Sequence, residues 1–226
     1  KQSLVEWDCG TMGLGVLVSD SLMFQRGAPS PSDPHLSHVY GLALPLLKRG
    51  MPVTPVQLEN VTAPRYLDSF RLLLLSYHGQ KPLSPDVHAP LAAWVKRGGV
   101  LVVVDDDGDP CNAVREWWNS GGFDYATPRE HLFEQLGLPR KGEPLRRVGK
   151  GAVCWLKEGP AKFSSSVAGD AALIGAVKNA EAHGRSAWRE TNYLLLRRGP
   201  YVIAAGLDES VAGGPKTLTG RFVNLF

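Results

Sequence analysis

The chain has 226 residues, of which 43% are hydrophobic and 21% are charged, and its formal net charge is +3. This composition suits an ordinary globular protein with a sizeable core. The small basic excess is scattered in pairs, so we expect neither nucleic acid nor a membrane surface as a partner. No apolar run reaches the roughly 18 residues that a membrane-spanning helix needs.

The ends and the cysteines of the sequence carry little positive information. The sequence opens on Lys1 with neither a signal peptide nor an initiator Met, and it stops at Phe226 inside an expected strand. We therefore expect a segment of a longer protein, and the compartment stays open.

Cys9, Cys111 and Cys154 are far apart and form neither a metal-binding spacing nor a disulfide framework. We predict no cofactor and no dedicated metal ligands.

Apolar runs alternate with helical patterns in the first half of the chain. Strands are predicted at residues 13–20, 52–58, 70–76 and 100–104. Two proline-led starts, Asp33-Pro34 and Ser84-Pro85, predict helices that stop at Gly50 and Gly98. Pro45 predicts a kink or an early end in the first helix, while Pro90 in the second has no explanation from the pattern.

The second half begins in the same style and then changes. We predict a short helix over 110–119, a helix from the capping box Thr127-Pro-Arg-Glu130 to Gly137, a strand over 151–156 and a helix over 170–183. Residues 193–197 and 201–207 flank a Gly-Pro turn and predict a β-hairpin, and 219–226 predicts a further strand.

These elements predict the α/β class. The alternation of strands and helices indicates a flavodoxin-like, doubly wound and mainly parallel sheet, followed by an antiparallel β tail. We expect an α/β domain over residues 1–184. The hairpin and strand over 185–226 would form either an edge of the sheet or the start of a β-sandwich.

The carboxyl ends of parallel strands are where α/β proteins usually place chemistry, so the loops after the strands are the candidate cleft. Their polar side chains follow three different strands and should meet at one edge of the sheet. They are Asp20, Ser21, Tyr77, His78, Asp105, Asp106 and Asp107.

The acidic turn after residue 104 has two interpretations. Asp105, Asp106 and Asp107, with Asp109, could bind Mg²⁺ or Ca²⁺ or contact a sugar, because hard cations prefer oxygen ligands. Their contiguous spacing does not match an EF-hand, and adjacent side chains diverge, so at most two could converge. We favour the structural interpretation, a turn that ends a strand and caps a helix.

Other candidates have the same ambiguity. Cys111 lies near a helix start, which can lower a thiol pKa and create a nucleophile, but a small buried residue is the favoured interpretation. His78 is favoured as a hydrogen-bonded loop residue over a catalyst. Trp117 and Trp118 could stack on a sugar ring, although packing in the core is the favoured role.

Several phrases of the sequence resemble the β-galactosidase trimerisation domain, the glutamine-amidotransferase-like middle domain of family 42 glycoside hydrolases. These phrases are LLKRG, PVTPVQL, YLDSFRLLLLS, LAAWVKRGGVLVVV and HLFEQLGL, and they lie within residues 14–138. The tail, from YLLLRRGPYVIAA to LTGRFVNLF, resembles the start of the β-sandwich that often follows such a domain.

The resemblance implies the fold and argues against the amidotransferase reaction. Class I glutamine amidotransferases place a cysteine in a tight elbow after the equivalent strand, and here Asp106 would take its place if Gly108 is the turn glycine. A carboxylate cannot replace a thiolate in that hydrolysis. We therefore expect a non-catalytic domain of a larger carbohydrate-active protein, which serves subunit or domain association through contacts with other domains of its chain or in a homo-oligomer.

Two alternatives stay open beside that expectation. The domain could bind a carbohydrate or a metal in the strand-end cleft, or it could act as a hydrolase through Cys111.

Overall fold

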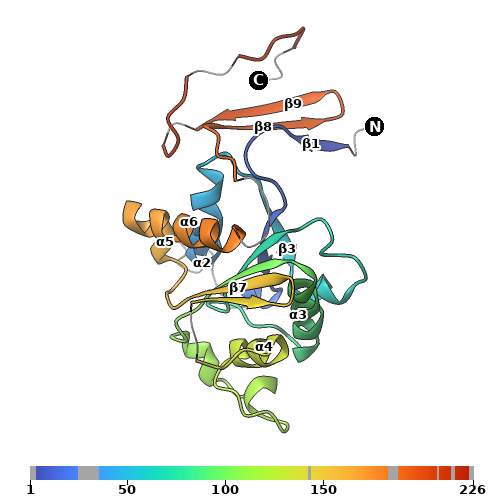
Figure 1. Ribbon diagram of the computed structural model, residues 1–226, viewed down its shortest axis with the longest axis vertical. Helices are drawn as coiled ribbons and strands as arrows, with labels where there is room; N and C mark the ends of the chain where they lie inside the picture. The colour runs from blue at the N-terminus through green and yellow to red at the C-terminus, as the bar shows by residue number, and fades with distance from the viewer. Residues whose placement is uncertain are drawn as a thin grey trace.

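The computed structural model describes residues 4–24, 36–141, 144–182, 188–207, 209–214 and 217–223. These residues form a six-stranded sheet with helices on both faces and, beyond one end of it, a separate three-stranded antiparallel sheet (Figure 1). Among the described residues no helix is long and apolar enough to cross a membrane.

The six-stranded sheet has the order β3-β2-β4-β5-β7-β6. Its strands are β2 (Leu14–Val18), β3 (Val53–Gln57), β4 (Leu72–Leu75), β5 (Val100–Val104), β6 (Leu145–Val148) and β7 (Gly151–Leu156). All neighbours are parallel except β6 and β7. The five parallel strands thus follow the flavodoxin-like order 2-1-3-4-5, which confirms the predicted α/β fold.

Two hydrophobic layers hold this sheet. One face packs on α3 (His88–Arg97), α4 (Pro128–Leu136) and the 3₁₀ turn η1 (Glu59–Thr62). The other face packs on α2 (Leu36–Leu47), α5 (Lys162–Ser165) and α6 (Val167–Glu181). Every residue of β4 and β5 is buried, as expected for central strands that are covered on both faces. A four-residue helix, α1 (Ser21–Phe24), follows β2.

The three-stranded sheet joins both ends of the chain. Its order is β1-β8-β9, with β1 at Val5–Trp7, β8 at Tyr193–Arg198 and β9 at Tyr201–Gly206. The hairpin β8-β9 confirms the predicted antiparallel tail, whereas β1 lies in a segment for which the sequence predicted no element. The predicted domain boundary at residue 184 stays a prediction.

Several predicted elements need correction. Residues 110–119 form two 3₁₀ turns, η3 (Pro110–Ala113) and η4 (Trp117–Asn119), instead of one helix. Residues 219–223 are not in a strand, and 224–226 lie outside the described residues. The Thr127 side chain makes no capping bond, and the Glu130 carboxylate accepts from the Ala126 N–H instead, so the predicted capping box is wrong.

The prolines and helix starts are explained by the actual boundaries. Helix α3 begins at His88, after the 3₁₀ turn η2 (Pro85–Val87), so Pro90 lies in its first turn, where the missing N–H has no intrahelical partner to lose. Helix α2 continues past Pro45 to Leu47, without the early end that the sequence allowed. The predicted start at Asp33-Pro34 lies outside the described residues. Helix α6 begins at Val167, where the Ser166 hydroxyl accepts from the Gly169 N–H.

Candidate functional site

The loops after β4 and β5 bring a histidine and two carboxylates together. His78 Nε2 lies 2.5 Å from Asp106 Oδ1 and 3.7 Å from Asp105 Oδ1. One ligand atom from each of the three residues lies within 4.8 Å of the other two. The loop after β7 also approaches, because a methyl group on Gly159 would lie 3.6 Å from Asp106 Oδ2.

Each carboxylate of the acidic turn also shapes the turn. Asp105 Oδ1 accepts the Asp107 N–H at 2.8 Å, and Asp106 Oδ1 accepts the Gly108 N–H at 2.8 Å. Asp107 has a φ of 64°, a left-handed conformation that is uncommon for a residue other than glycine. The favoured interpretation of the sequence was a turn that ends a strand and caps a helix. Asp105 and Asp106 stabilise the turn after β5 itself, and the cap of the following 3₁₀ turn comes from Asp109, whose carboxylate accepts the Cys111 N–H.

The first two aspartates have different electrostatic surroundings. Burial raises the pKa of Asp105, whose side chain is 1% exposed. Partial burial also acts to raise the pKa of Asp106, but hydrogen bonds from Gly108 and His78 outweigh it and hold that pKa below its ordinary value. Asp106 therefore carries a negative charge at neutral pH, next to a ring nitrogen of His78.

Asp107 is turned away from His78 and held by Arg129. The guanidinium donates from Nε and Nη2 to the two carboxylate oxygens, each at 2.9 Å. Arg129 is buried, and its guanidinium carbon lies 4.1 Å from the Trp155 ring centroid and 4.8 Å from that of Phe133. This bidentate, ring-stacked geometry is the strong form of an arginine–carboxylate pair. Asp107 is therefore a structural residue of the turn.

A second buried ion pair ties the same two loops together. Lys81 Nζ lies 2.6 Å from Asp109 Oδ2 and donates to the Tyr77 carbonyl at 2.6 Å. Asp109 also accepts the backbone N–H groups of Gly79 and Cys111. Burial acts to raise the Asp109 pKa, but Lys81 outweighs it and lowers that pKa below its ordinary value.

The buried Gln80 side chain lies between the ends of β2 and β4, where the strand order reverses. The Gln80 amide donates to the carbonyls of Leu17 and Ser76 and accepts the Ser19 N–H. A flavodoxin-like sheet usually binds its ligand at this switch point. In this protein the Gln80 side chain lies at the switch point. The polar side chains that come together, His78, Asp105 and Asp106, lie after β4 and β5 instead.

Asp20 and Ser21 lie on the same sheet edge but do not join His78. The Asp20 carboxylate is exposed and accepts from Gln57 Nε2 at 2.9 Å. The Ser21 hydroxyl donates to the Lys81 carbonyl at 2.6 Å and accepts the Lys81 N–H at 2.7 Å. Ser21 is therefore connected to the acidic turn through Lys81 and its ion pair, whereas Asp20 hydrogen-bonds with Gln57 and Glu59.

Tyr77 points into the interior and begins a buried hydrogen-bonded chain. Its hydroxyl lies 2.6 Å from His88 Nε2, and His88 Nδ1 lies 2.8 Å from His131 Nδ1. Burial raises the pKa of Tyr77, and it lowers the pKa of His88 to about 3. Trp117 packs edge-on against both histidine rings. Both tryptophans donate their indole N–H to backbone carbonyls, Trp117 to Pro82 and Trp118 to Asn112.

Cys111 borders a hollow of about 310 Å³ beside the strand-end loops. The hollow is also lined by Ser21, Lys81, Pro82, Leu83, Val114, Glu116 and Trp118. Burial, followed by the Asp109 carboxylate, raises the pKa of the Cys111 thiol. A raised pKa leaves less thiolate at neutral pH than a free cysteine has, which is unfavourable for a nucleophile.

Sequence reasoning missed Lys81 and Arg129, the two cations that fix the acidic turn. Lys81 lies three residues after His78, so its position at the same edge of the sheet could have been predicted. Arg129 gives a different signal, because a cation in the first turn of a helix opposes the helix dipole. That misplaced charge indicates a specific anionic partner.

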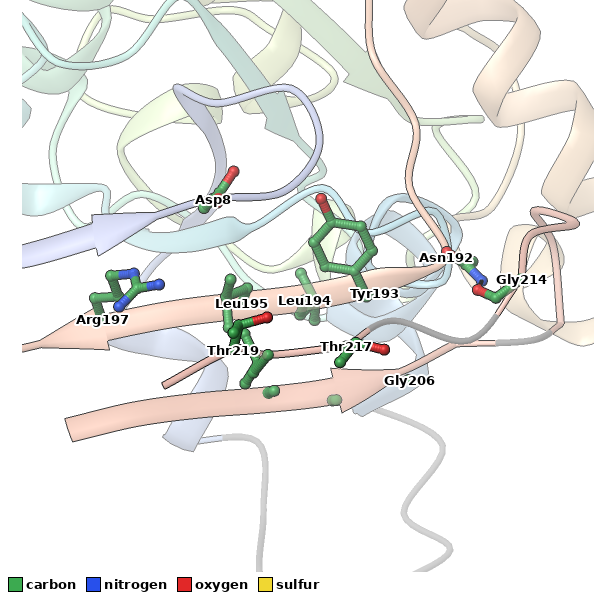
Figure 2. A pocket seen from close by; sticks show the side chains of 13 residues that line it. Asp8, Asn192, Tyr193, Leu194, Leu195, Arg197, Gly206, Gly214, Thr217 and Thr219 are labelled. Carbon is green, nitrogen blue, oxygen red and sulfur yellow. Dashed lines mark hydrogen bonds between the residues drawn. The ribbon is translucent and has the colours of Figure 1, made fainter. Parts of the chain in front are cut away.

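A second hollow, of about 520 Å³, lies far along the chain from these loops, against the three-stranded sheet. Figure 2 shows Leu194, Leu195 and Arg197 of β8 on one side of it, with Thr217 and Thr219 opposite. Asn192 closes one end, where its amide donates to the Gly214 carbonyl at 3.3 Å.

Comparison with known proteins adds no relative: a scan against protein-family models finds no match, and a search of curated proteins finds none either.

Proposed function

We propose that this chain is a non-catalytic, amidotransferase-like domain of a larger carbohydrate-active protein, and that it associates with another part of that protein through its three-stranded sheet. The single observation that carries the association is an apolar row across that sheet. The carbohydrate-active setting rests on the resemblance of residues 14–138 to trimerisation domains of family 42 glycoside hydrolases.

The row is formed by three residues that lie directly opposite one another. Trp7 pairs with Leu196, and Leu196 pairs with Ile203, so all three side chains point to the same face of the sheet. Ile203 is 58% exposed. Leu195, which points to the opposite face, is buried. Other side chains of that opposite face, Glu6, Arg197 and Ala204, are exposed, but they are charged or small. The face with Trp7, Leu196 and Ile203 is therefore the more apolar of the two.

The next row of the same face adds two apolar side chains, one on each side of the exposed Arg198. Val5 and Tyr201 lie opposite Arg198, and Tyr201 is 46% exposed. Strand β9 also forms an edge, with β8 as its neighbour within the described sheet. An exposed apolar face beside an open edge is typical of an interaction surface. The partner that fits a flat row across three strands is a second sheet, as in a β-sandwich.

The acidic turn supports the non-catalytic part of the proposal. In a nucleophile elbow, the strained residue after the strand carries the attacking group. Here the residue with positive φ is Asp107, whose carboxylate is occupied by Arg129, and Asp106 is occupied by His78 and Gly108. The alternative nucleophile, Cys111, has a raised pKa.

Site-specific photo-crosslinking in the intact protein tests the association. A benzophenone amino acid at position 203 should capture a strand of another domain, in a product that peptide mapping can locate. The same probe at Ala204, the next residue of β9, points to the other face and serves as the matched control. If the probe at position 203 captured a second copy of this chain, the partner would be a homo-oligomer instead of another domain. Equally low crosslinking yields at positions 203 and 204 would refute the proposal.

A further inference from the structure

The strand-end cluster has a property that the association role does not use. His78, Asp105 and Asp106 bring one ring nitrogen and two carboxylates within 4.8 Å of one another, from two loops that the sheet holds in register. Ion pairs are common on protein surfaces, so convergence alone does not make a binding site.

The independent observation is an unsatisfied oxygen of Asp105. This side chain is 1% exposed, and its Oδ1 accepts the Asp107 N–H and lies 3.7 Å from His78 Nε2. Its Oδ2 is buried and has no hydrogen-bond partner among the residues that the structure describes. A buried acceptor without a partner costs roughly 1–3 kcal/mol, and more when it is charged. This oxygen belongs to the carboxylate whose Oδ1 lies 3.7 Å from His78 Nε2, and a bound cation would supply the partner that it lacks.

We propose that His78, Asp105 and Asp106 form a binding site for a divalent transition-metal ion, with Zn²⁺ as the best-fitting probe. One imidazole nitrogen and two carboxylate oxygens make a mixed donor set that Zn²⁺ accepts, whereas Mg²⁺ and Ca²⁺ prefer oxygen alone. With a neutral imidazole, the two carboxylates supply the two negative charges that balance the ion. Three protein ligands leave a fourth position, which water can take because solvent reaches the cluster at the half-exposed Asp106 side chain.

Binding requires one small rearrangement. The 2.5 Å contact between His78 Nε2 and Asp106 Oδ1 is a hydrogen bond, and two ligands of one metal ion at about 2.0–2.2 Å each lie farther apart than that. The shared proton leaves to solvent as the metal takes its place. The Asp106 side chain, which is 41% exposed, has room to turn, while the buried Asp105 and the sheet keep the other ligands fixed.

Titration of the full chain with Zn²⁺, after treatment with a chelator, tests the site. We expect one equivalent to bind. His78→Ala and Asp106→Asn should each weaken binding by at least about tenfold, and Asp105→Asn should also weaken it. Asp20→Asn is the matched control, since Asp20 is an exposed acid on the same sheet edge that binds Gln57 instead. Mg²⁺ and Ca²⁺ should bind more weakly than Zn²⁺.

Two further measurements separate this site from other metal binding. Cys111→Ser should leave the affinity unchanged, and bound Co²⁺ should show no thiolate charge-transfer band. Zn²⁺ should raise the melting temperature of the wild type and of Asp20→Asn but not of Asp106→Asn. Because the Asp106 side chain is 41% exposed, its replacement by Asn should leave the fold intact, so misfolding would not explain the missing effect. Absence of saturable binding, or binding that survives both His78→Ala and Asp106→Asn, would overturn the proposal. Loss of Zn²⁺ binding would leave the association face untested, so the two proposals fail separately.

Discussion

The buried histidine pair makes the stability of this protein sensitive to mild acid. His88 is fully buried between Tyr77 and His131, and burial lowers its pKa from 6.5 to about 3. In the unfolded chain its pKa is near 6.5, so below that pH the unfolded state binds a proton that the folded state refuses. The folded protein therefore requires a neutral His88. The free energy of unfolding has its full value above pH 6.5, and it decreases as the pH falls towards 3.

The size of the effect follows from the proton difference. Each pH unit below 6.5 removes about 1.4 kcal/mol from the free energy of unfolding until the folded His88 also takes up a proton. Between pH 7.5 and pH 5.5 the loss from His88 is about 1.4 kcal/mol. Burial also lowers the pKa of His131, which adds to the loss in the same direction. This window lies above the usual range of carboxylate titration. The raised pKa of Asp105 acts in the opposite direction, because there the folded state binds the extra proton.

Urea denaturation, followed by tryptophan fluorescence at pH 7.5, 6.5 and 5.5, measures this loss. The variant His88→Gln is the control, because a glutamine amide can accept from Tyr77 and donate to His131 without titrating. We expect the wild type to lose stability over this range and the variant to lose clearly less. The reasoning is refuted if His88→Gln keeps the full pH slope of the wild type, or if the wild type shows no slope.

Three further predictions concern single residues. Arg129→Met removes the bidentate pair with Asp107 and should lower the free energy of unfolding by about 3 kcal/mol, measured from the denaturation midpoint; a loss below about 1 kcal/mol would contradict the assigned role. Gly41→Ala places a methyl carbon 1.8 Å from the Pro160 carbonyl oxygen, so the melting temperature should fall by several degrees; a rise, as helix propensity alone predicts, would contradict the packing. Cys111 should react with iodoacetamide at neutral pH more slowly than a free cysteine, and faster labelling would revive the hydrolase alternative.

The strands that the sequence identified are those whose burial leaves a local signal. β4 and β5 are apolar at every position, and their length and glycine boundaries separate them from helices. β6 was missed because its sequence, Leu-Arg-Arg-Val, is that of a charged edge strand. β1 was missed because three residues show no period, and its partner β8 lies almost the whole chain away. Pairing at that distance depends on tertiary structure and leaves no local pattern.

The candidate site was predictable in outline from topology. Parallel strand ends share an edge, so His78 and the acidic turn could be expected to meet, and two of the three aspartates do face His78. The inward path of Tyr77 was not predictable, because it depends on where His88 and His131 lie in the folded protein. Nor could the sequence show that Arg129 takes Asp107 out of the cluster, since that bond joins residues 22 positions apart through the packing of α4.

The measurement that most directly tests the association proposal is hydrogen exchange at β9 in the intact protein. If the apolar row docks on a partner sheet, the amides of residues 201–206 should exchange more slowly in the intact protein than in the isolated chain. Ile203→Glu should remove that difference, because it places a charge in the row, whereas Ala204→Glu, on the opposite face, should keep it. Equal exchange in both contexts, or equal effects of the two variants, would contradict the role of this sheet as an association surface.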